Sequence, residues 1–131
     1  MQGITEGNVY DQLRKLNHKA KWQRVENAVG PGTPDVWFCY KGQGIWIENK
    51  VGYRSERKKT IRVPKDKLRP GQCAWMTDCQ LHGGMAMVAI YAKPTLYVVD
   101  FSLFIWSRLG EGIPEIELSM MDIKEILHAH D

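Results

Sequence analysis

Residues 30–51 read GPGTPDVWFCYKGQGIWIENKV, a stretch with the composition of two β-strands joined by a turn that contains glycine. We expect the first strand over about residues 34–40, the turn over residues 41–44 and the second strand over residues 45–51. Side chains alternate between the two faces of a strand, and both faces of this hairpin are largely apolar. The hairpin should therefore lie inside a sheet that is covered on both sides, which indicates an α/β layered fold.

Helices and further strands are expected on either side of this hairpin. Thr5 and Pro70 suit the first positions of two helices, and Gly83-Gly84 suits the end of the second. The remaining elements are predicted over residues 5–20 (helix), 22–29 (strand), 70–81 (helix), 85–91 (strand), 95–99 (strand) and 101–109 (helix), with a last helix that begins at Ser119. The fold class is therefore α/β, with a central mixed sheet and helices on both of its faces.

Length and composition fit one compact intracellular domain. The chain has 131 residues, of which 44% are hydrophobic and 25% are charged, and this is enough for a single core. No membrane-spanning stretch or signal peptide is expected, and the odd count of three cysteines favours free thiols. We assign residues 1–93 to the functional core and residues 94–131 to a C-terminal extension packed on the same domain.

Charge is distributed unevenly along the chain. Residues 51–69 carry eight basic and two acidic residues, a net charge of +6, whereas residues 94–131 carry a net charge of −5. The basic segment could be only a solvated loop, but its charge suits a flap that follows the phosphates of a nucleic acid. Its basic residues are Arg54, Arg57, Lys58, Lys59, Arg62, Lys65, Lys67 and Arg69.

Three charged residues, Asp35, Glu48 and Lys50, stand at the ends of the hairpin strands, where apolar residues would be expected. If Tyr40 pairs with Ile45 across the turn, Asp35 lies opposite Lys50 and all three charged side chains share one face. Asp35 and Glu48 are then diagonal neighbours, roughly 7 Å apart at the backbone. Two carboxylates beside one ammonium suit Mg²⁺ or Mn²⁺, because these ions prefer oxygen ligands.

An ion pair between Asp35 and Lys50, with Glu48 solvated at the strand end, is the alternative explanation of this cluster. For any one of the three residues taken alone, that explanation is the simpler one. Taken together, with glycines at positions 30 and 32 allowing close backbone approach and the basic segment directly following, the residues favour a site.

These residues also carry a family resemblance. The chain resembles the PD-(D/E)XK nuclease superfamily, and within it the virus-type replication-repair nuclease (VRR-NUC) proteins of phages. The resemblance covers residues 6–92 and rests on four segments in order: GPGTPDVWF (30–38), WIENK (46–50), LRPGQCAW (68–75) and GGMAMVAIYA (83–92). It implies a restriction-endonuclease-like fold.

The resemblance assigns roles to individual residues. Asp35 and Glu48 would bind the divalent metal, with the main-chain carbonyl of Asn49 completing the shell, and Lys50 would serve the attacking water. Gln72 would reach toward the metal-bound water or the scissile phosphate; a plain polar residue at a helix start is the alternative, and the functional role is favoured. Asn49 departs from the family pattern, where this position is usually apolar.

The third carboxylate of the site is left open between Glu6 and Glu26. An acidic residue on the first helix often joins the site in this family, which points to Glu6, but a carboxylate there also complements the helix N-terminus. Glu26 is the competing candidate, with an ion pair to Arg24 as its simpler explanation.

The activity that the resemblance implies is metal-dependent DNA cleavage that leaves 3′-hydroxyl and 5′-phosphate ends. Branched DNA such as a four-way junction is the leading substrate, and no organic cofactor is expected. Two symmetric cuts would need a homodimer, formed through the first helix or the C-terminal extension. The alternatives are a nuclease for flaps, nicks or plain duplex, and a nucleic-acid-binding module without catalysis.

Overall fold

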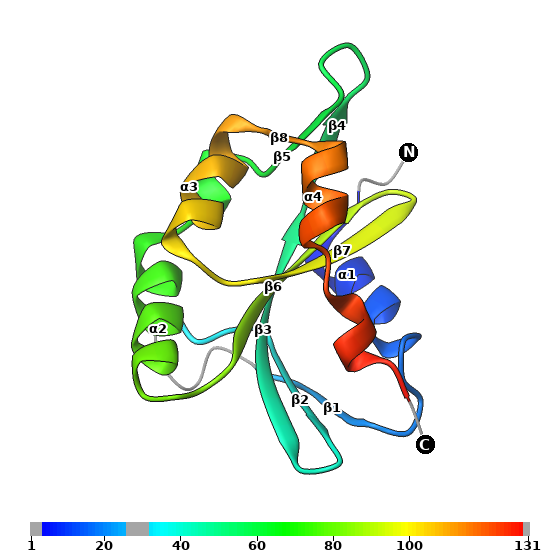
Figure 1. Cartoon of the computed structure of the whole chain (residues 1–131), viewed down its shortest axis with the longest axis vertical. Helices are drawn as coiled ribbons and strands as arrows, with labels where there is room; N and C mark the ends of the chain where they lie inside the picture. Colours follow the sequence, from blue (N-terminus) through cyan, green and yellow to red (C-terminus); the bar gives the residue numbers. More distant parts are fainter. Residues whose placement is uncertain (1–3, 26–31, 130–131) are drawn as a thin grey trace.

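The structure is a computed structural model that describes residues 4–25 and 32–129. Its centre is a five-stranded sheet in the order β1-β2-β3-β6-β7 (Figure 1). β3 and β6 are parallel, and every other neighbouring pair in this sheet is antiparallel. The strands are β1 (Lys21–Arg24), β2 (Val36–Tyr40), β3 (Gln43–Val51), β6 (Ala86–Ala92) and β7 (Thr95–Asp100).

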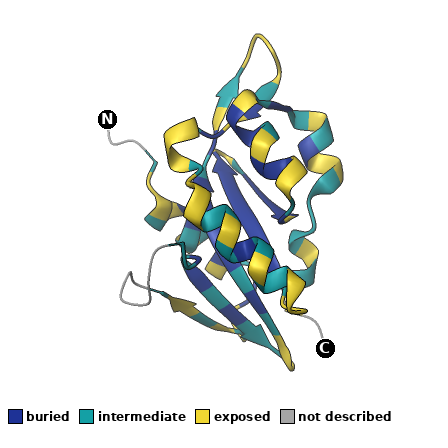
Figure 2. Cartoon of the chain, turned by 90° about the vertical axis from the view of Figure 1, so that its left-hand side faces the viewer, coloured by how far each residue is buried: buried dark blue, intermediate teal, exposed yellow. Residues whose placement is uncertain are grey.

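Helices cover both faces of the sheet, and its central strands are buried between them (Figure 2). On one face, α1 (Glu6–Arg14) packs Val9 and Leu13 against β3, β6 and β7. On the other face, α2 (Pro70–Leu81) and α3 (Leu103–Glu111) pack against the even-numbered side chains of β6. The expected α/β class, a central mixed sheet with helices on both faces, is confirmed.

The β2–β3 hairpin has a tighter turn than the sequence predicts. Lys41 and Gly42 form a two-residue turn, with φ of 48° and 80°, and positive φ at both central residues is typical of type I′ hairpins. Tyr40 therefore pairs with Gln43 instead of Ile45, and the expected register is wrong by two residues. Because two is an even shift, every side chain keeps its predicted face.

Helix α1 ends at Arg14, whereas a helix to about Ala20 was expected. The reason is Asn17, whose Oδ1 accepts hydrogen bonds from the backbone N–H groups of Lys19 (2.9 Å) and Ala20 (3.0 Å). Asparagine side chains compete in this way with helical bonding. Strand β1 ends at Arg24, and most of the remainder of the strand predicted over residues 22–29 lies outside the described residues.

The second core helix has the predicted bounds of residues 70–81, but the C-terminal prediction is wrong. Ser119 lies inside α4 (Glu115–Met121) instead of beginning the last helix. Asp122 ends α4, and its Oδ1 accepts from the backbone N–H groups of Val98 and Lys124. The residues that follow form only a short 3₁₀ helix, η3 (Lys124–Leu127).

The basic segment contributes two strands to a second, small sheet that the sequence did not predict. Its strands are β4 (Tyr53–Ser55), β5 (Thr60–Arg62) and β8 (Ile113–Pro114), followed after β5 by the 3₁₀ helix η2 (Lys65–Lys67). Strands β4 and β5 form a hairpin, called the basic hairpin below. Pairing of β5 with β8 joins this hairpin to the C-terminal extension. The division of the chain at residue 93 stays a prediction. In the described part of the chain, no helix is long and apolar enough to cross a membrane.

Candidate metal and catalytic site

The charged cluster lies where β2 begins and β3 ends, on the face of the sheet that α2 covers. Val36 pairs with Ile47, so extending this register by one residue sets Asp35 opposite Glu48. Glu48 and Lys50 are each 1% exposed. The structure thus brings Asp35, Glu48 and Lys50 to one place, and the shift of two residues sets Asp35 directly opposite Glu48 instead of diagonal to it.

Gln72 ties this cluster to α2. Its Nε2 donates to Glu48 Oε2 at 2.9 Å, and its Oε1 accepts from Lys50 Nζ at 2.9 Å. The same Oε1 accepts from the Arg69 backbone N–H at 3.3 Å. Gln72 is the third residue of the helix, a position from which a side chain can fold back over the helix start. One amide therefore fixes the relative positions of the carboxylate and the ammonium.

The Lys50 ammonium is held from several sides. Its Nζ lies 3.2 Å from Glu48 Oε2 and also donates to the backbone carbonyl of Lys67. The ring of Trp106, from α3, lies 5.5 Å from the same nitrogen, within the range of a cation–π contact. Lys50 therefore pairs with Glu48, and Glu48 is buried. The alternative of an Asp35–Lys50 pair with a solvated Glu48 does not describe this site.

Asp35 and the backbone of Asn49 meet at the open end of the β2–β3 ladder. Asp35 Oδ2 accepts from the Asn49 N–H at 2.9 Å. In an antiparallel ladder the N–H and C=O of one residue point to the same neighbouring strand, so the Asn49 carbonyl also points to the Asp35 side. The register would set Pro34 opposite Asn49, and proline has no N–H to donate. The ladder therefore leaves this carbonyl available to another partner.

The electrostatics of Glu48 indicate that the cluster lacks a positive charge. Burial, and after it the nearby charge of Asp35, raise the pKa of Glu48 to about 8 against the opposing effect of Lys50. Within the described residues, Glu48 Oε1 is buried without a hydrogen-bond partner. Two adjacent carboxylates and one ammonium carry a net negative charge in a poorly solvated place, which must be balanced by a proton or by a cation.

Glu6 does not join the two carboxylates directly. It is exposed at the start of α1 and lines a hollow of about 530 Å³ that also contains Lys50, Lys67 and Arg69. Over residues 4–25 and 32–129, no three side chains of His, Cys, Asp or Glu converge as a metal group. The oxygen donors at the cluster are therefore Asp35, Glu48 and the Asn49 carbonyl. Glu26 lies outside the described residues.

Gly32 is needed for packing instead of for access by a ligand. Its φ is 91°, and a Cβ there would collide with the carbonyl oxygen of Gly71, at 2.7 Å from the carbonyl carbon. The loop before β2 thus lies directly against the first turn of α2, next to Gln72. Gly30, the other glycine predicted to give close approach, is outside the described residues.

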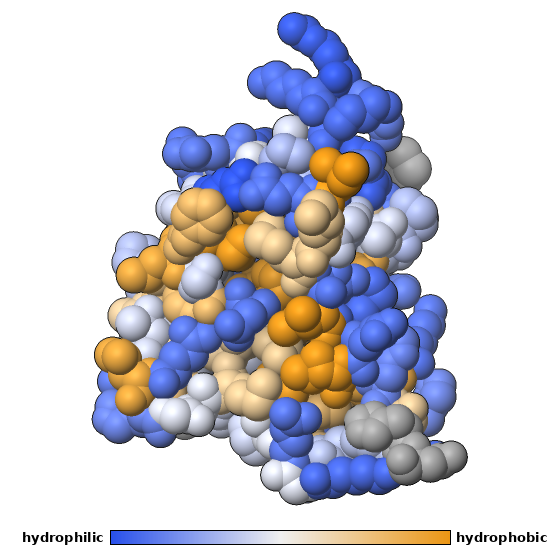
Figure 3. Space-filling view, in the orientation of Figure 1, coloured by the Kyte–Doolittle hydropathy of each residue, from blue (hydrophilic) through white to orange (hydrophobic). Residues whose placement is uncertain are grey.

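The predicted DNA-contacting residues fall into two groups. Seven of the eight are exposed, and the β4–β5 turn that carries three of them projects as a hydrophilic extension at the top of the molecule (Figure 3). Arg54 differs: it pairs with Glu115 and donates to the backbone carbonyls of Lys93 (2.7 Å) and Ala92 (3.1 Å). These bonds hold the Arg54 guanidinium against the protein, which argues against a contact between Arg54 and a DNA phosphate. The exposed seven are Arg57, Lys58, Lys59, Arg62, Lys65, Lys67 and Arg69.

Two contributors to the site were not found from the sequence. Trp106 lies 56 residues beyond Lys50 and reads as an ordinary apolar residue of its helix. The Lys67 contact is made by a backbone carbonyl, for which no residue type is a signal. Both belong to segments that are distant from the cluster in the sequence and lie beside it in the folded chain.

Comparison with known proteins gives a limited result. No protein-family model and no curated protein sequence matches the chain. Among solved structures, the chain is similar to Hjc, a Holliday junction resolvase from the archaeal hyperthermophile Archaeoglobus fulgidus, with a TM-score of 0.46 and 16% identity. The match covers 88% of this chain and 95% of Hjc.

Proposed function

We propose that this chain is a divalent-metal-dependent deoxyribonuclease of the PD-(D/E)XK type, related to the VRR-NUC proteins. The observation that carries the proposal is that Glu48 and Lys50 are buried and joined by Gln72 through hydrogen bonds of 2.9 Å, with the half-buried Asp35 beside them. Burying these charges together costs folding free energy. Such a cluster lowers the stability of the fold, so a contribution to stability does not explain it. Its place beside an exposed basic hairpin favours a role in chemistry on a phosphate.

The residues of the cluster fit a hard divalent cation such as Mg²⁺ or Mn²⁺. Asp35, Glu48 and the Asn49 carbonyl would hold it, all through oxygen atoms. The unpartnered Glu48 Oε1 and the raised pKa of this carboxyl both mark a place where positive charge is missing. When bound, such an ion neutralises phosphate charge and lowers the pKa of a coordinated water.

Lys50 and Gln72 supply fixed polar groups to the reaction. The Lys50 ammonium is restrained by Gln72 and by the Lys67 carbonyl, so it needs little reorganisation to orient a water or to stabilise negative charge on a phosphate. Gln72 holds both Lys50 and Glu48, and its amide is close to the place where the scissile phosphate would lie. We propose Glu6 as an additional carboxylate, because it faces the same hollow as Lys50.

Contacts with the DNA backbone are proposed for the exposed basic residues of segment 57–69, without Arg54. The hollow beside Lys50 is lined by Lys67 and Arg69, so phosphates that follow this segment would be led to the cluster. Tyr53 is 56% exposed at the same hollow and is available to stack on a base.

The proposed substrate is branched DNA, with a four-way junction first and flaps, nicks or plain duplex as the competing substrates. Two symmetric cuts require two active sites, so we propose a homodimer. A nucleic-acid-binding module without catalysis is the other candidate, and the intact charged cluster speaks against it.

Cleavage assays on end-labelled junction, flap, nicked and linear DNA, with Mg²⁺, Mn²⁺ or EDTA, test this proposal. We expect metal-dependent cutting that Asp35→Asn and Lys50→Ala each reduce by at least 100-fold while DNA binding is kept. Glu111→Gln and Lys41→Ala, exposed residues away from the cluster, are the matched controls and should cut normally. Normal cutting by Asp35→Asn would reject the site, and binding without any cutting by the unaltered protein would favour the non-catalytic module. Light scattering after gel filtration gives the oligomeric state.

A further inference from the structure

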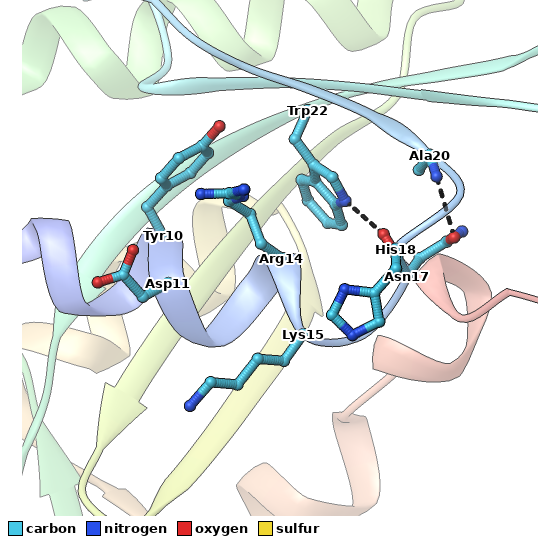
Figure 4. A pocket seen from close by; sticks show the side chains of 8 residues that line it. All are labelled: Tyr10, Asp11, Arg14, Lys15, Asn17, His18, Ala20 and Trp22. Atoms are coloured by element: carbon cyan, nitrogen blue, oxygen red, sulfur yellow. Dashed lines mark hydrogen bonds between the residues drawn. The ribbon is translucent and has the colours of Figure 1, made fainter.

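A second positively charged hollow lies on the opposite side of the sheet, between the C-terminal end of α1 and strand β1 (Figure 4). Its volume is about 630 Å³, and its walls include Tyr10, Arg14, Lys15, His18 and Trp22. The proposed nuclease site uses none of these residues. The hollow therefore needs an explanation of its own.

Four cations of this surface have no carboxylate partner among the residues that the structure describes. Arg14, Lys15, Lys21 and Arg24 are exposed, and none of them forms an ion pair within the described residues. Asp11 is the acidic residue of the hollow, and its carboxylate is directed away from Arg14 (Figure 4).

Arginines of the C-terminal extension and the basic hairpin behave differently from those of this surface. Arg108 pairs with Glu117, and Arg54 pairs with Glu115. Residues 11–24 hold five basic residues and one acidic residue, a net charge of +4 on a chain whose total is only +3. Two segments of the chain thus carry a large excess of positive charge, residues 51–69 and residues 11–24.

The hollow is also held in a fixed shape. The guanidinium groups of Arg14 and Arg24 each lie 5.6 Å from the centre of the Tyr10 ring, so one aromatic side chain draws two like charges together. The Trp22 indole N–H donates to the Asn17 carbonyl at 2.8 Å, which fixes the opposite wall. Cations arranged beforehand around a recess bind an anion at a lower ordering cost than free surface side chains do.

Strand β1 links this hollow to the proposed nuclease site. β1 is the edge of the sheet, and the backbone N–H of Val25, just after it, donates to the Asp35 carbonyl at 2.7 Å. Trp22 and Arg24 pair with Phe38 and Val36, whose side chains lie on the α1 face. Asp35 has the opposite parity, so the two sites are on opposite faces of the sheet and meet at its edge.

We propose that this hollow binds the phosphate backbone of a second duplex arm, while the first arm follows segment 57–69 to the nuclease site. The proposal rests on the proposed function, because it assumes that the substrate is DNA. It deepens that function by assigning part of the selectivity for branched DNA to a surface distinct from the catalytic cluster. A single straight duplex on the α2 face would leave this hollow empty.

Binding measurements by fluorescence anisotropy test the proposal, with Asp35→Asn as the background to prevent cutting. We expect Arg14→Gln/Lys15→Gln to weaken binding of a four-way junction at least fivefold and binding of a linear duplex less than twofold. The slope of log K against log salt for the junction should fall by about 1.8, since each phosphate contact contributes about 0.9. The charge-matched control, Lys41→Gln/Lys93→Gln, should change neither quantity.

Equal weakening for junction and duplex, or no weakening for either, would overturn the second-arm proposal. Competition by inorganic phosphate or a mononucleotide at concentrations that leave duplex binding intact would also overturn it, in favour of a small-anion site. Thermal melting of the double variant should match the background protein, because both altered side chains are exposed. If the unaltered protein cuts no DNA, only the proposed function is rejected. The second-arm proposal is still tested, because the anisotropy experiment measures binding.

Discussion

Gln72 Nε2 donates a hydrogen bond of 2.9 Å to Glu48 Oε2, and this bond joins the first turn of α2 to the end of β3. The other end of the same amide accepts from Lys50. Because an amide carries a donor NH₂ and an acceptor carbonyl on the same carbon, it can hold a carboxylate and an ammonium side by side. The position of α2 therefore sets the geometry of the charged cluster.

Gln72→Ala should reduce DNA cutting by about 100-fold with little change in DNA binding, because Glu48 and Lys50 lose their shared partner. Single-turnover cleavage and anisotropy on the same DNA measure the two effects. Gln23→Ala, an exposed glutamine on β1, is the matched control. A loss of binding as large as the loss of cutting would show that Gln72 holds the DNA instead of the catalytic groups.

Metal binding should release close to one proton at pH 7. Without metal, burial and Asp35 raise the pKa of Glu48 to about 8, so this carboxyl is mostly protonated at neutral pH. A cation must displace that proton, and the apparent affinity for Mn²⁺ should rise with pH until about pH 8. Calorimetric titrations in two buffers of different ionisation enthalpy measure the release. Identical heats in both buffers would contradict the protonated state of Glu48.

Glu48→Gln should stabilise the metal-free protein at pH 8 and have little effect at pH 4.5. The folded pKa of Glu48 is raised above its usual 4.5, so between these pH values the unfolded chain has lost a proton that the folded chain keeps. Stability contributed by the protonated carboxyl is therefore lost as pH rises from about 4.5 to about 8. The uncharged side chain of the Glu48→Gln variant avoids this loss of stability. At about 1.4 kcal/mol per pKa unit, the loss amounts to a few kcal/mol. Urea unfolding in EDTA at both pH values measures it; equal stability changes at the two would refute the assignment.

The sequence predicted the parts of this site that depend on local pattern. Strand parity placed Asp35, Glu48 and Lys50 on one face correctly, because parity survives a shift of two residues. The register itself was wrong, since Lys41 adopts a positive φ that is uncommon for lysine. Parity is a property of each strand alone, whereas register depends on the turn that joins two strands.

Contacts between distant segments could not be predicted in this way. The tie between Arg54 and Glu115 joins residues 61 positions apart, and each alone reads as a surface charge. The same holds for β8, two residues long, which is a strand only because β5 lies beside it. The acidic C-terminal extension therefore helps to hold the basic hairpin in place. The net charges of the two segments alone could not predict these contacts.

Arg54→Gln should therefore lower stability rather than DNA affinity. The substitution breaks the ion pair with Glu115 and leaves the carbonyls of Ala92 and Lys93 without a guanidinium donor, at a cost of roughly 1–3 kcal/mol. Arg62→Gln, on an exposed side chain of β5, should leave stability unchanged and weaken DNA binding. Urea unfolding and anisotropy on both variants separate the two roles. The reverse pattern would return Arg54 to the DNA-contacting set.

Gly32→Ala should impair cutting much more than its effect on the local backbone alone would explain. Gly32 has φ of 91°, and an added Cβ would collide with the Gly71 carbonyl, which cannot move without displacing the start of α2 and Gln72. Gly42→Ala is the matched control, because Gly42 has φ of 80° but nothing lies within 4 Å of its added Cβ. Backbone strain of roughly 1–2 kcal/mol is common to both variants.

The two glycine variants should therefore separate strain from displacement of the site. Gly42→Ala should lose stability and keep its cutting rate when assayed folded, whereas Gly32→Ala should lose about 100-fold in cutting, since a shift of 1 Å in a positioning group has an effect of that size. Single-turnover rates below the melting temperature of each variant provide the comparison. If both variants cut at the normal rate, the packing of Gly32 on Gly71 does not control Gln72, and the alignment of Glu48 with Lys50 must be maintained by β3 itself.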